Sequence, residues 1–446
     1  MKISFQASLP SSSERQRSGR GGKRSDVENT GGKEKEMREE KGSRRLSQDQ
    51  SFHTHTHMYT HTHAHTLTHN TVSSVRRHTA EPGRVHFHVL VAERPHRLES
   101  YLRCRGIAAE VIRARSEDDV TSPRRSARTV CIHDVSLHAL AGFEDGSLQT
   151  FMGTVQELVS VRTARGVTGN LASPANFARF LIPHLFASQH AVLYLDVDTV
   201  VQGDVTALWA DLYSVQENTE QQFAVTHNGP GERGARHGAT APRNRAPVLA
   251  AVPRVQPTYG DFFSSKAVRS LFAQRRQQQD GVRDHLDESA QTFNAGVLVL
   301  FPQRWLSQGI DKELVWWMQQ HYHHMQQGAG SEAGLWDFGT QPLLLLCAYK
   351  RWAALDARWN VNGLGYRSDL GADVLNQAFL LHWNGRQKPW LEHVGLHRDL
   401  WLPYFRNACS HHGTCDLSAA AADSMQAPCT CQPGWSGSLC QASVKS

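Results

Sequence analysis

Two carboxylates, Asp196 and Asp198, stand one residue apart at the end of a short apolar run, AVLYL (191–195). The run predicts a buried strand, and side chains two residues apart in extended backbone point to the same side. We therefore expect both carboxylates to converge where the strand ends. Hard oxygen donors in this arrangement suit Mg²⁺ or Mn²⁺, which would bridge a diphosphate. The alternative is a pair of exposed loop carboxylates, because Asp-x-Asp also occurs by chance.

A second polar group, HWNGRQKPW (382–390), follows another strand-like run. His382 would complete the metal shell, Gly385 would let the backbone approach a phosphate, and Lys388 would supply a point charge. The alternative for His382 is a hydrogen-bonded structural histidine.

The segments that must position these groups alternate between strand-like and helix-like patterns. Strand-like runs cover 85–93, 109–114, 191–195, 293–301 and 379–384. Helical spacing covers 70–79, 96–107, 175–186 and 311–325. This alternation predicts an α/β fold with a largely parallel sheet, and ligands of such sheets bind at the carboxyl ends of the strands. Residues 226–256, rich in Gly, Pro, Arg and Ala, predict a long loop.

The 446 residues allow one large domain and a smaller one. The formal charge is +6, and residues 14–45 hold many of the Lys and Arg residues beside few apolar ones. We interpret 14–45 as a disordered tail and expect no nucleic-acid partner, with a nucleic-acid-binding arm as the alternative. The sequence contains no run of about 18 apolar residues, so it predicts no membrane-spanning helix. No signal peptide or membrane anchor is visible in it either.

Residues 53–69 read HTHTHMYTHTHAHTLTH, in which His alternates with Thr or small residues. His-rich tracts bind metal in some proteins. We favour the other interpretation, a translated nucleotide repeat without function.

The cysteines are unevenly distributed, because five of the eight lie near the C-terminus. These five are Cys409, Cys415, Cys429, Cys431 and Cys440. Such density predicts a disulfide framework and hence an oxidising compartment. A zinc site is the alternative, although paired Cys-x₂-Cys spacing is absent from the segment.

Three segments in order, YLDVDTVVQGD, FNAGV and HWNGRQKPW, closely resemble glycosyltransferase family 8, as does the helix that carries Ala178-Arg179-Phe180. The resemblance covers about residues 70–404. It implies a GT-A type fold with a Rossmann-like, mostly parallel sheet. It also implies a UDP-sugar donor, Mn²⁺ (or Mg²⁺), and transfer that retains the configuration at the anomeric carbon.

The resemblance also implies roles for single residues. Asp196, Asp198 and His382 would be metal ligands, while Gly385 and Lys388 would contact the diphosphate. Arg179 would bind the donor sugar or support the groups that do. Gln341, with Asn294, would act in catalysis, Gln341 lying nearest the reacting carbon. Many family members have Asp before this Gln, whereas this chain has Thr340.

The chain departs from the family at its start, where an apolar strand that holds the nucleotide would be expected and the His/Thr tract stands instead. We expect residues 1–69 to be a disordered, low-complexity leader, either misassigned or repeat-derived, that contributes no buried strand. A chain that lacks a central strand should be weakly stable and should bind UDP loosely. Residues 70–405 would form the glycosyltransferase domain.

Residues 406–441 resemble an EGF-like module, through Cys-x-Cys, Gly434-Trp435 and Gly437. The pairing of that family would join Cys409 to Cys429 and Cys431 to Cys440, and would leave Cys415 over. Such a module would offer a site for a protein partner.

The motifs together predict a metal-dependent hexosyltransferase that takes a sugar from a UDP-sugar to a glycan, protein or lipid acceptor. The family resemblance places it in the Golgi or the secretory pathway lumen. One alternative is a non-catalytic protein that keeps the fold and binds nucleotide-sugar or glycan. Another is an adhesion protein defined by its EGF-like end.

Overall fold

The computed structural model describes residues 64–404, except 83–84, 92–94, 105–106, 113–128, 136–145, 165–173, 210–211, 213–245, 264, 281–283, 328–333, 337–338 and 391–394. It also describes residues 2–8, 53–58, 413–415, 429–431, 433, 435–436 and 442–443.

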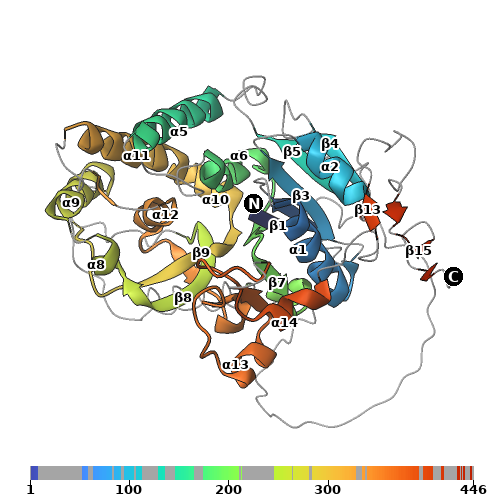
Figure 1. Ribbon diagram of the computed structural model, residues 1–446. Helices are drawn as coiled ribbons and strands as arrows, with labels where there is room; N and C mark the ends of the chain where they lie inside the picture. The colour runs from blue at the N-terminus through green and yellow to red at the C-terminus, as the bar shows by residue number, and fades with distance from the viewer. Residues whose placement is uncertain are drawn as a thin grey trace, which may run out of the picture.

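A 9-stranded sheet forms the centre of the molecule (Figure 1). Its strands, in spatial order, are β10 (Trp352–Ala354), β8 (Leu249–Thr258), β9 (Gln291–Leu300), β6 (Ala191–Asp196), β1 (Lys2–Ser8), β2 (His53–Met58), β3 (Val85–Val91), β5 (Val130–Asp134) and β4 (Ala109–Ile112). The α/β fold class is thereby confirmed.

The expected largely parallel sheet is correct only in part. Strands β2, β3, β5 and β4 run parallel, as do β10 and β8. The pairs β8–β9, β9–β6, β6–β1 and β1–β2 between them are antiparallel. An apolar run reports that both faces of a strand are buried, and a central strand meets this condition in either direction. The sequence pattern therefore did not encode strand direction, and the sheet is mixed.

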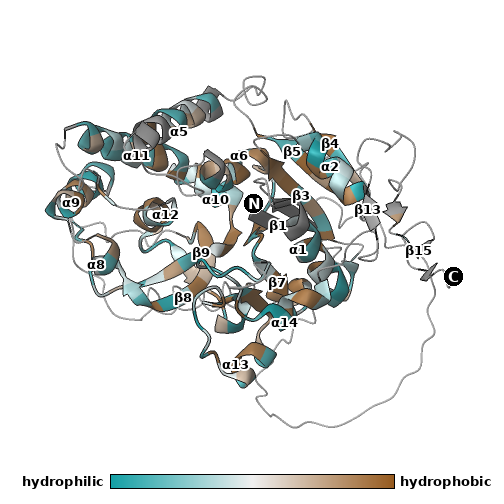
Figure 2. Cartoon of the chain, viewed as in Figure 1, coloured by the Kyte–Doolittle hydropathy of each residue, from teal (hydrophilic) through white to brown (hydrophobic). Residues whose placement is uncertain are grey.

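Both faces of the sheet are covered by apolar side chains. In β6, Val192 and Tyr194 join one buried cluster, and Leu193 and Leu195 join the other. The first cluster packs against α5 (Gly146–Ala164), α6 (Ile182–Leu185), α10 (Pro302–Ser307), α11 (Ile310–Gln327) and α12 (Gln341–Ala348). The second packs against α1 (Ala64–His78), α2 (Pro95–Cys104) and a smaller sheet. In Figure 2, β3 and much of β9 are accordingly coloured as hydrophobic.

The smaller sheet has the order β11 (Val361–Asn362), β12 (Leu380–His382) and β7 (Thr199–Val201). Strand β7 begins directly after Asp198, and its Thr199 lies opposite His382 in an antiparallel register. This register places the YLDVD motif beside the first residue of HWNGRQKPW. It is the part of the fold that assembles the site.

The N-terminal residues differ from the expected leader, because β1 and β2 come from it. Strand β2 runs parallel to β3 with Thr56 opposite Phe87, and β1 runs antiparallel to β6 with Ile3 opposite Leu195. The expectation that 1–69 contributes no strand is therefore corrected. Sheet hydrogen bonds join backbone groups, and the β-branched Thr residues of the His/Thr tract favour extended backbone.

Two further expectations are corrected along the chain. The expected helix 175–186 is a 3₁₀ helix, η4 (Pro174–Leu181), followed by α6. Pro183 stands in the first turn of α6, where the missing amide hydrogen costs little. The expected loop 226–256 contains the first residues of β8, whose Pro253 lies beside a register shift in the pairing with β9. Prolines beside such irregularities do not end a strand.

The remaining helices are short or peripheral. They are α8 (Tyr259–Phe262), α9 (Lys266–Asp280), η5 (Ala357–Asn360), α13 (Ala372–Gln377), α14 (Arg398–Trp401) and η6 (Leu402–Tyr404). None of the helices in the described part of the chain is long and apolar enough to cross a membrane.

The C-terminal segment contains two small antiparallel pairs, β13 (Gly413–Cys415) with β14 (Cys429–Cys431), and β15 (Trp435–Ser436) with β16 (Ala442–Ser443). Cys431 is disulfide-bonded. Cys409 and Cys440 lie outside the described residues. The disulfide pairing and the EGF-like module therefore stay predictions.

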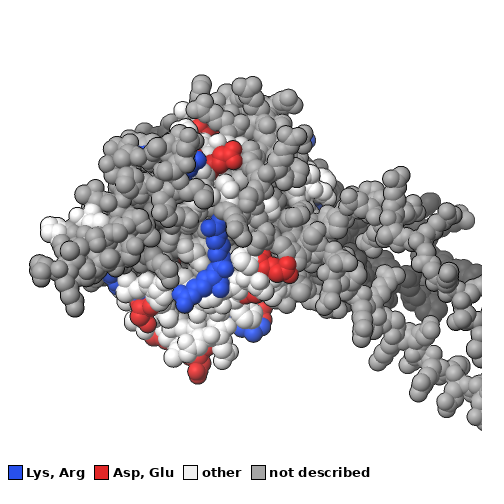
Figure 3. Space-filling view, turned by 90° about the vertical axis from the view of Figure 1, so that its right-hand side faces the viewer, with Lys and Arg blue, Asp and Glu red and all other residues white. Residues whose placement is uncertain are grey.

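One face of the molecule shows how the surface charges are mixed. In Figure 3 the Lys and Arg side chains that are coloured gather in a short streak, and acidic side chains lie on either side of it. The basic segment 14–45 lies outside the described residues. The nucleic-acid alternative concerns that segment, so it stays untested.

Candidate metal and donor site

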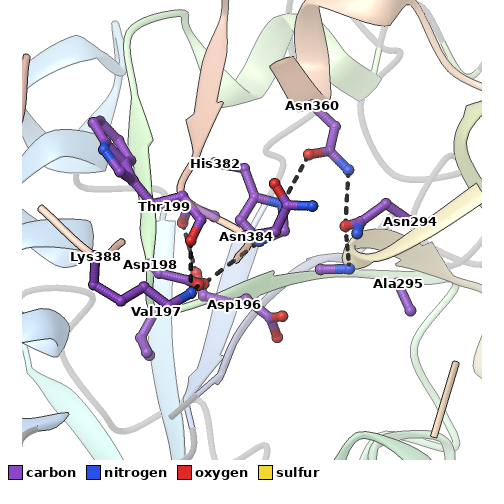
Figure 4. Close-up of polar contacts among 12 residues, drawn as sticks. Asp196, Val197, Asp198, Thr199, Asn294, Ala295, Asn360, His382, Asn384 and Lys388 are labelled. Atoms are coloured by element: carbon purple, nitrogen blue, oxygen red, sulfur yellow. Dashed lines mark hydrogen bonds and ion pairs between the residues drawn. The ribbon is translucent and has the colours of Figure 1, made fainter. Parts of the chain in front are cut away.

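Asp196, Asp198 and His382 lie together where β6, β7 and β12 meet (Figure 4). One ligand atom from each of the three lies within 4.8 Å of the others. Asp196 ends β6, Asp198 stands just before β7, and the pairing of β7 with β12 brings in His382. The structure thus joins two of the predicted motifs at one point.

Asp198 is the most constrained of the three. Its carboxylate forms an ion pair with Lys388 and lies 3.5 Å from Nε2 of His382. The ammonium of Lys388 also donates to the carbonyl of Trp383 at 2.6 Å, and Trp383 N–H donates to the carbonyl of Asp198 at 2.8 Å. Burial alone would raise the pKa of Asp198, but the charges of Lys388 and His382 outweigh burial and hold that pKa below its ordinary value. Asp198 is therefore a carboxylate anion at neutral pH.

Asp196 is oriented from the other side of the sheet. The hydroxyl of Tyr194 donates to its Oδ1 at 2.6 Å, and the guanidinium of Arg179 lies 3.7 Å from the same oxygen. Burial raises the pKa of Tyr194 well above its usual value, so this hydroxyl keeps its proton and remains a donor. Arg179 also donates to the carbonyl of Ala295 at 2.6 Å and lies over the Tyr194 ring. Arg179 therefore links the β6 and β9 motifs.

A chain of hydrogen bonds fixes the proton on His382. Gly296 N–H donates to Oδ1 of Asn294 at 2.9 Å, and the same oxygen accepts from the amide of Asn360 at 3.4 Å. The amide oxygen of Asn360 then lies 3.0 Å from Nδ1 of His382. A backbone N–H can only donate, so each partner along the chain has a defined role and Nδ1 carries the hydrogen. When the ring is neutral, its lone pair is then on Nε2, where an ion held by Asp198 could bind it.

Gly296 makes room for this imidazole. A methyl group in place of its hydrogen would lie 2.8 Å from Nε2 of His382 and closer still to Cε1. Side chains essentially never approach one another so closely, so the FNAGV motif requires glycine at this position.

Gln341 and Gly385 lie beside this centre. Oε1 of Gln341, at the start of α12, accepts from Ala295 N–H at 3.1 Å, next to Asn294. Gly385 has a φ of +110°, and an added methyl group would lie 2.7 Å from the carbonyl oxygen of Gly365. Both conditions exclude a larger residue at 385.

All of the predicted metal, donor and catalytic residues therefore lie in or next to one site. Asn360, Gly296 and Tyr194 belong to the same network, and residue patterns did not single them out. Tyr194 lies inside the motif YLDVD, and Gly296 inside FNAGV. Asn360 has no such signal, because only the pairing of β11 with β12 places it beside His382.

The donor set fits a divalent cation. Two carboxylates and one imidazole with an accessible lone pair are a ligand set that hard or borderline ions accept. The 3.5 Å between Nε2 of His382 and Asp198 Oδ1 exceeds the usual length of a charge-assisted hydrogen bond, about 2.7–2.9 Å. The spacing therefore allows one ion to bind both atoms.

The family model of glycosyl transferase family 8 matches residues 70–393, which are most of the chain. The α/β fold and the carboxylate–histidine site agree with this match. The chain belongs to glycosyltransferase family 8.

Relatives of this family share the central part of the chain. Glycosyltransferase 8 domain-containing protein 2 of Homo sapiens is 29% identical over 239 residues, which cover 53% of this chain and 59% of the relative. Probable galacturonosyltransferase 9 of Arabidopsis thaliana is 24% identical over 248 residues, covering 55% and 35% of the two chains. The matched segment thus spans less than two thirds of either relative.

Solved structures also align with the chain, with low scores. The galactosyltransferase LgtC, in complex with donor and acceptor sugar analogues, aligns over 78% of this chain and 94% of LgtC, with 16% identity and a TM-score of 0.40. A similarity of this size is too low to support any conclusion about substrates.

Proposed function

We propose that the protein transfers a hexosyl or related sugar from a UDP-sugar to a glycan, protein or lipid acceptor, with retention at the anomeric carbon and dependence on a divalent metal. One observation carries the proposal. The hydrogen-bond chain from Gly296 through Asn294 and Asn360 aims the lone pair of His382 at the point that Asp196 and Asp198 also face. A histidine kept only for structure would not need this orientation next to two carboxylates.

Manganese is the ion we expect, with magnesium as the second choice. An imidazole ligand is uncommon for Mg²⁺, which prefers oxygen donors and water, whereas Mn²⁺ accepts a mixed set more readily. The ion would supply positive charge to the diphosphate as the sugar leaves.

The residues around the metal ligands have separate tasks. Lys388, already fixed by Asp198 and the Trp383 carbonyl, would stabilise negative charge on the leaving diphosphate. Gly385 would let the backbone approach the same phosphates. Arg179 is a positioning residue, because its contacts with Ala295, Asp196 and Tyr194 hold other members of the site.

Gln341 and Asn294 would face the donor sugar. The carbonyl oxygen of Gln341 uses one lone pair on Ala295 N–H and keeps a second for a developing positive charge at the anomeric carbon. The Oδ1 of Asn294 is engaged within the protein, so its amide hydrogens are the groups that would bind a sugar hydroxyl.

The C-terminal segment and the location are separate proposals. We infer an EGF-like module that binds a protein partner, and a lumenal location in the secretory pathway or Golgi. The density of cysteines near the C-terminus supports an oxidising compartment.

The test is turnover of a panel of UDP-sugars by the full chain, with Mn²⁺ and with a chelator. We expect one or a few donors to release UDP only when metal is present. Metal-dependent UDP binding without turnover of any donor, under conditions in which a known family member is active, would favour the non-catalytic binding protein instead.

A further inference from the structure

The β8–β9 pair continues beyond the point where β6 ends. Leu195, the residue before Asp196, lies opposite Val297 in the antiparallel pair. Asn294 and Thr292 therefore lie beyond the end of β6, on the side where the metal ligands are. Arg254 of β8 lies opposite Thr292. The two strands thus form a wall beside the site, and they run side by side in Figure 1.

Arg254 points to the donor side of this wall. Residues that alternate along a strand share a face, and Ala250 and Val252 pack in the same cluster as Leu381 and Trp383, the neighbours of His382. Across the strand, Thr292 shares its face with Asn294. Residues diagonal to one another across such a pair lie about 7–8 Å apart, so Arg254 is within reach of a molecule bound next to Asn294.

The guanidinium of Arg254 is half-buried. No residue in the described part of the chain forms an ion pair or a side-chain hydrogen bond with it. Burial lowers the pKa of Arg254, and the nearby Tyr366 partly offsets this shift. By contrast Arg367, in the same loop as Tyr366, is paired with Asp369 at 3.0 Å. A partly desolvated cation that none of the described carboxylates pairs with is suited to bind an anion from outside.

Tyr366 is an exposed ring on a rigid support. It is 52% exposed, although its neighbours are tightly packed. Its ring lies against Gly363 and Gly385, both of which have positive φ. The loop is tied to the His382 motif, because Gly365 N–H donates to the Asn384 carbonyl at 3.1 Å and Gln387 N–H donates to the Gly365 carbonyl at 2.8 Å.

We propose that Arg254 and Tyr366 form an acceptor subsite for a sugar that carries an oxyanion, with the guanidinium on the anion and the ring against the C–H face of the sugar. The subsite rests on the proposed function, since it lies next to the donor position. Guanidinium groups bind carboxylates and phosphates with two parallel hydrogen bonds. An exposed aromatic ring adds apolar contact at little entropic cost. A carboxylate (uronate) and a phosphate ester share this chemistry, and the test separates them.

The experiment uses the full chain with UDP and Mn²⁺ bound. The probes are methyl β-glucuronide, methyl glucoside 6-phosphate and methyl β-glucoside, whose binding is measured by saturation-transfer NMR titration. We expect at least one anionic glycoside to bind about tenfold or more tightly than the neutral one. The anionic glycoside that binds more tightly shows whether the subsite takes a carboxylate or a phosphate ester.

Arg254→Gln should abolish the preference for the anion, and Arg254→Lys should restore part of it. Arg367→Gln is the matched control and should keep the preference. Tyr366→Ala should weaken all three glycosides alike, whereas Tyr366→Phe should not.

Two results would overturn the inference. One is equal binding of anionic and neutral glycosides to a wild-type protein that binds UDP normally, which leaves the proposed function intact. The other is an Arg254→Gln effect on UDP-sugar affinity instead of acceptor affinity. Failure of the wild type to bind UDP with Mn²⁺ would instead count against the proposed function itself.

Discussion

The metal centre and the acceptor rim are held in different ways. The metal centre (Asp196, Asp198, His382) is fixed by interlocking contacts from every neighbouring element, including Lys388 and Asn360. The acceptor rim (Arg254, Tyr366) is part-exposed, and no side-chain hydrogen bond or ion pair joins it to another described residue. The contrast suggests that the shared chemistry of the family requires rigid geometry, whereas the choice of acceptor needs only a shaped and charged edge. Substitutions in the metal centre should therefore affect every substrate, and those in the rim only some.

The largest effect is expected for Asp198→Ala, which removes a metal ligand and leaves Lys388 without its carboxylate. Turnover of the preferred UDP-sugar should fall by about a thousandfold or more, because charge stabilisation by the ion is worth several kcal/mol. Asp198→Asn keeps the shape of the side chain and should fall similarly. Asp369→Ala, at an exposed ion pair, is the control and should keep its activity. Turnover of Asp198→Asn close to wild type, at saturating Mn²⁺, would contradict the assignment.

Asn360→Leu should have the next largest effect, because it removes the acceptor that keeps the hydrogen on Nδ1 of His382. We expect Mn²⁺ affinity to fall by about 10–100-fold, as is usual when a partner of a metal-bound histidine is lost. Asn360→Asp still accepts from Nδ1 and should lose less. The exposed Asn376→Ala serves as the control. Titration of the metal by calorimetry measures all four proteins, and equal affinities would show that the hydrogen-bond chain does not orient the imidazole.

Gly296→Ala tests whether the His382 imidazole needs the space beside Gly296. The added methyl group must displace the imidazole, so metal binding should be lost even if the chain folds. Gly153→Ala is the opposite case, since nothing lies within 4 Å of its added methyl group inside α5. That substitution should stabilise the protein by about 0.5–1 kcal/mol. Thermal unfolding and metal titration separate the two outcomes, and unchanged metal binding in Gly296→Ala would contradict the close packing.

The smallest effects on the reaction are expected at the rim. Arg254→Gln should change which acceptor is used, while the metal affinity of the protein stays that of the wild type. A loss of Mn²⁺ affinity in Arg254→Gln would remove the distinction between the two regions.

Site residues could be predicted from the sequence where they lie in short continuous motifs. The Asp-x-Asp pair, His382 and Lys388 could be predicted because each follows an apolar strand whose end must lie at the sheet edge. Asn360 could not, because its place depends on the pairing of β11 with β12, which no periodicity specifies. Arg254 was hidden in a segment rich in Pro and Arg that resembled a loop. Its strand exists because β9 and β10 pair with it on either side.

The N-terminal strands show the same limit. The alternation of His and Thr looked unsuited to a sheet, yet β2 lies between neighbours that pair with its backbone. Local composition describes what a segment prefers when alone, and tertiary pairing overrides that preference.

The most direct test of the central claim is the affinity of the wild-type chain for UDP, measured by calorimetry with Mn²⁺ and again with EDTA. If Asp196, Asp198 and His382 hold an ion that binds the diphosphate, the affinity with Mn²⁺ should exceed that with EDTA by about tenfold or more. Equal affinity under the two conditions would contradict a metal-bridged donor at this site.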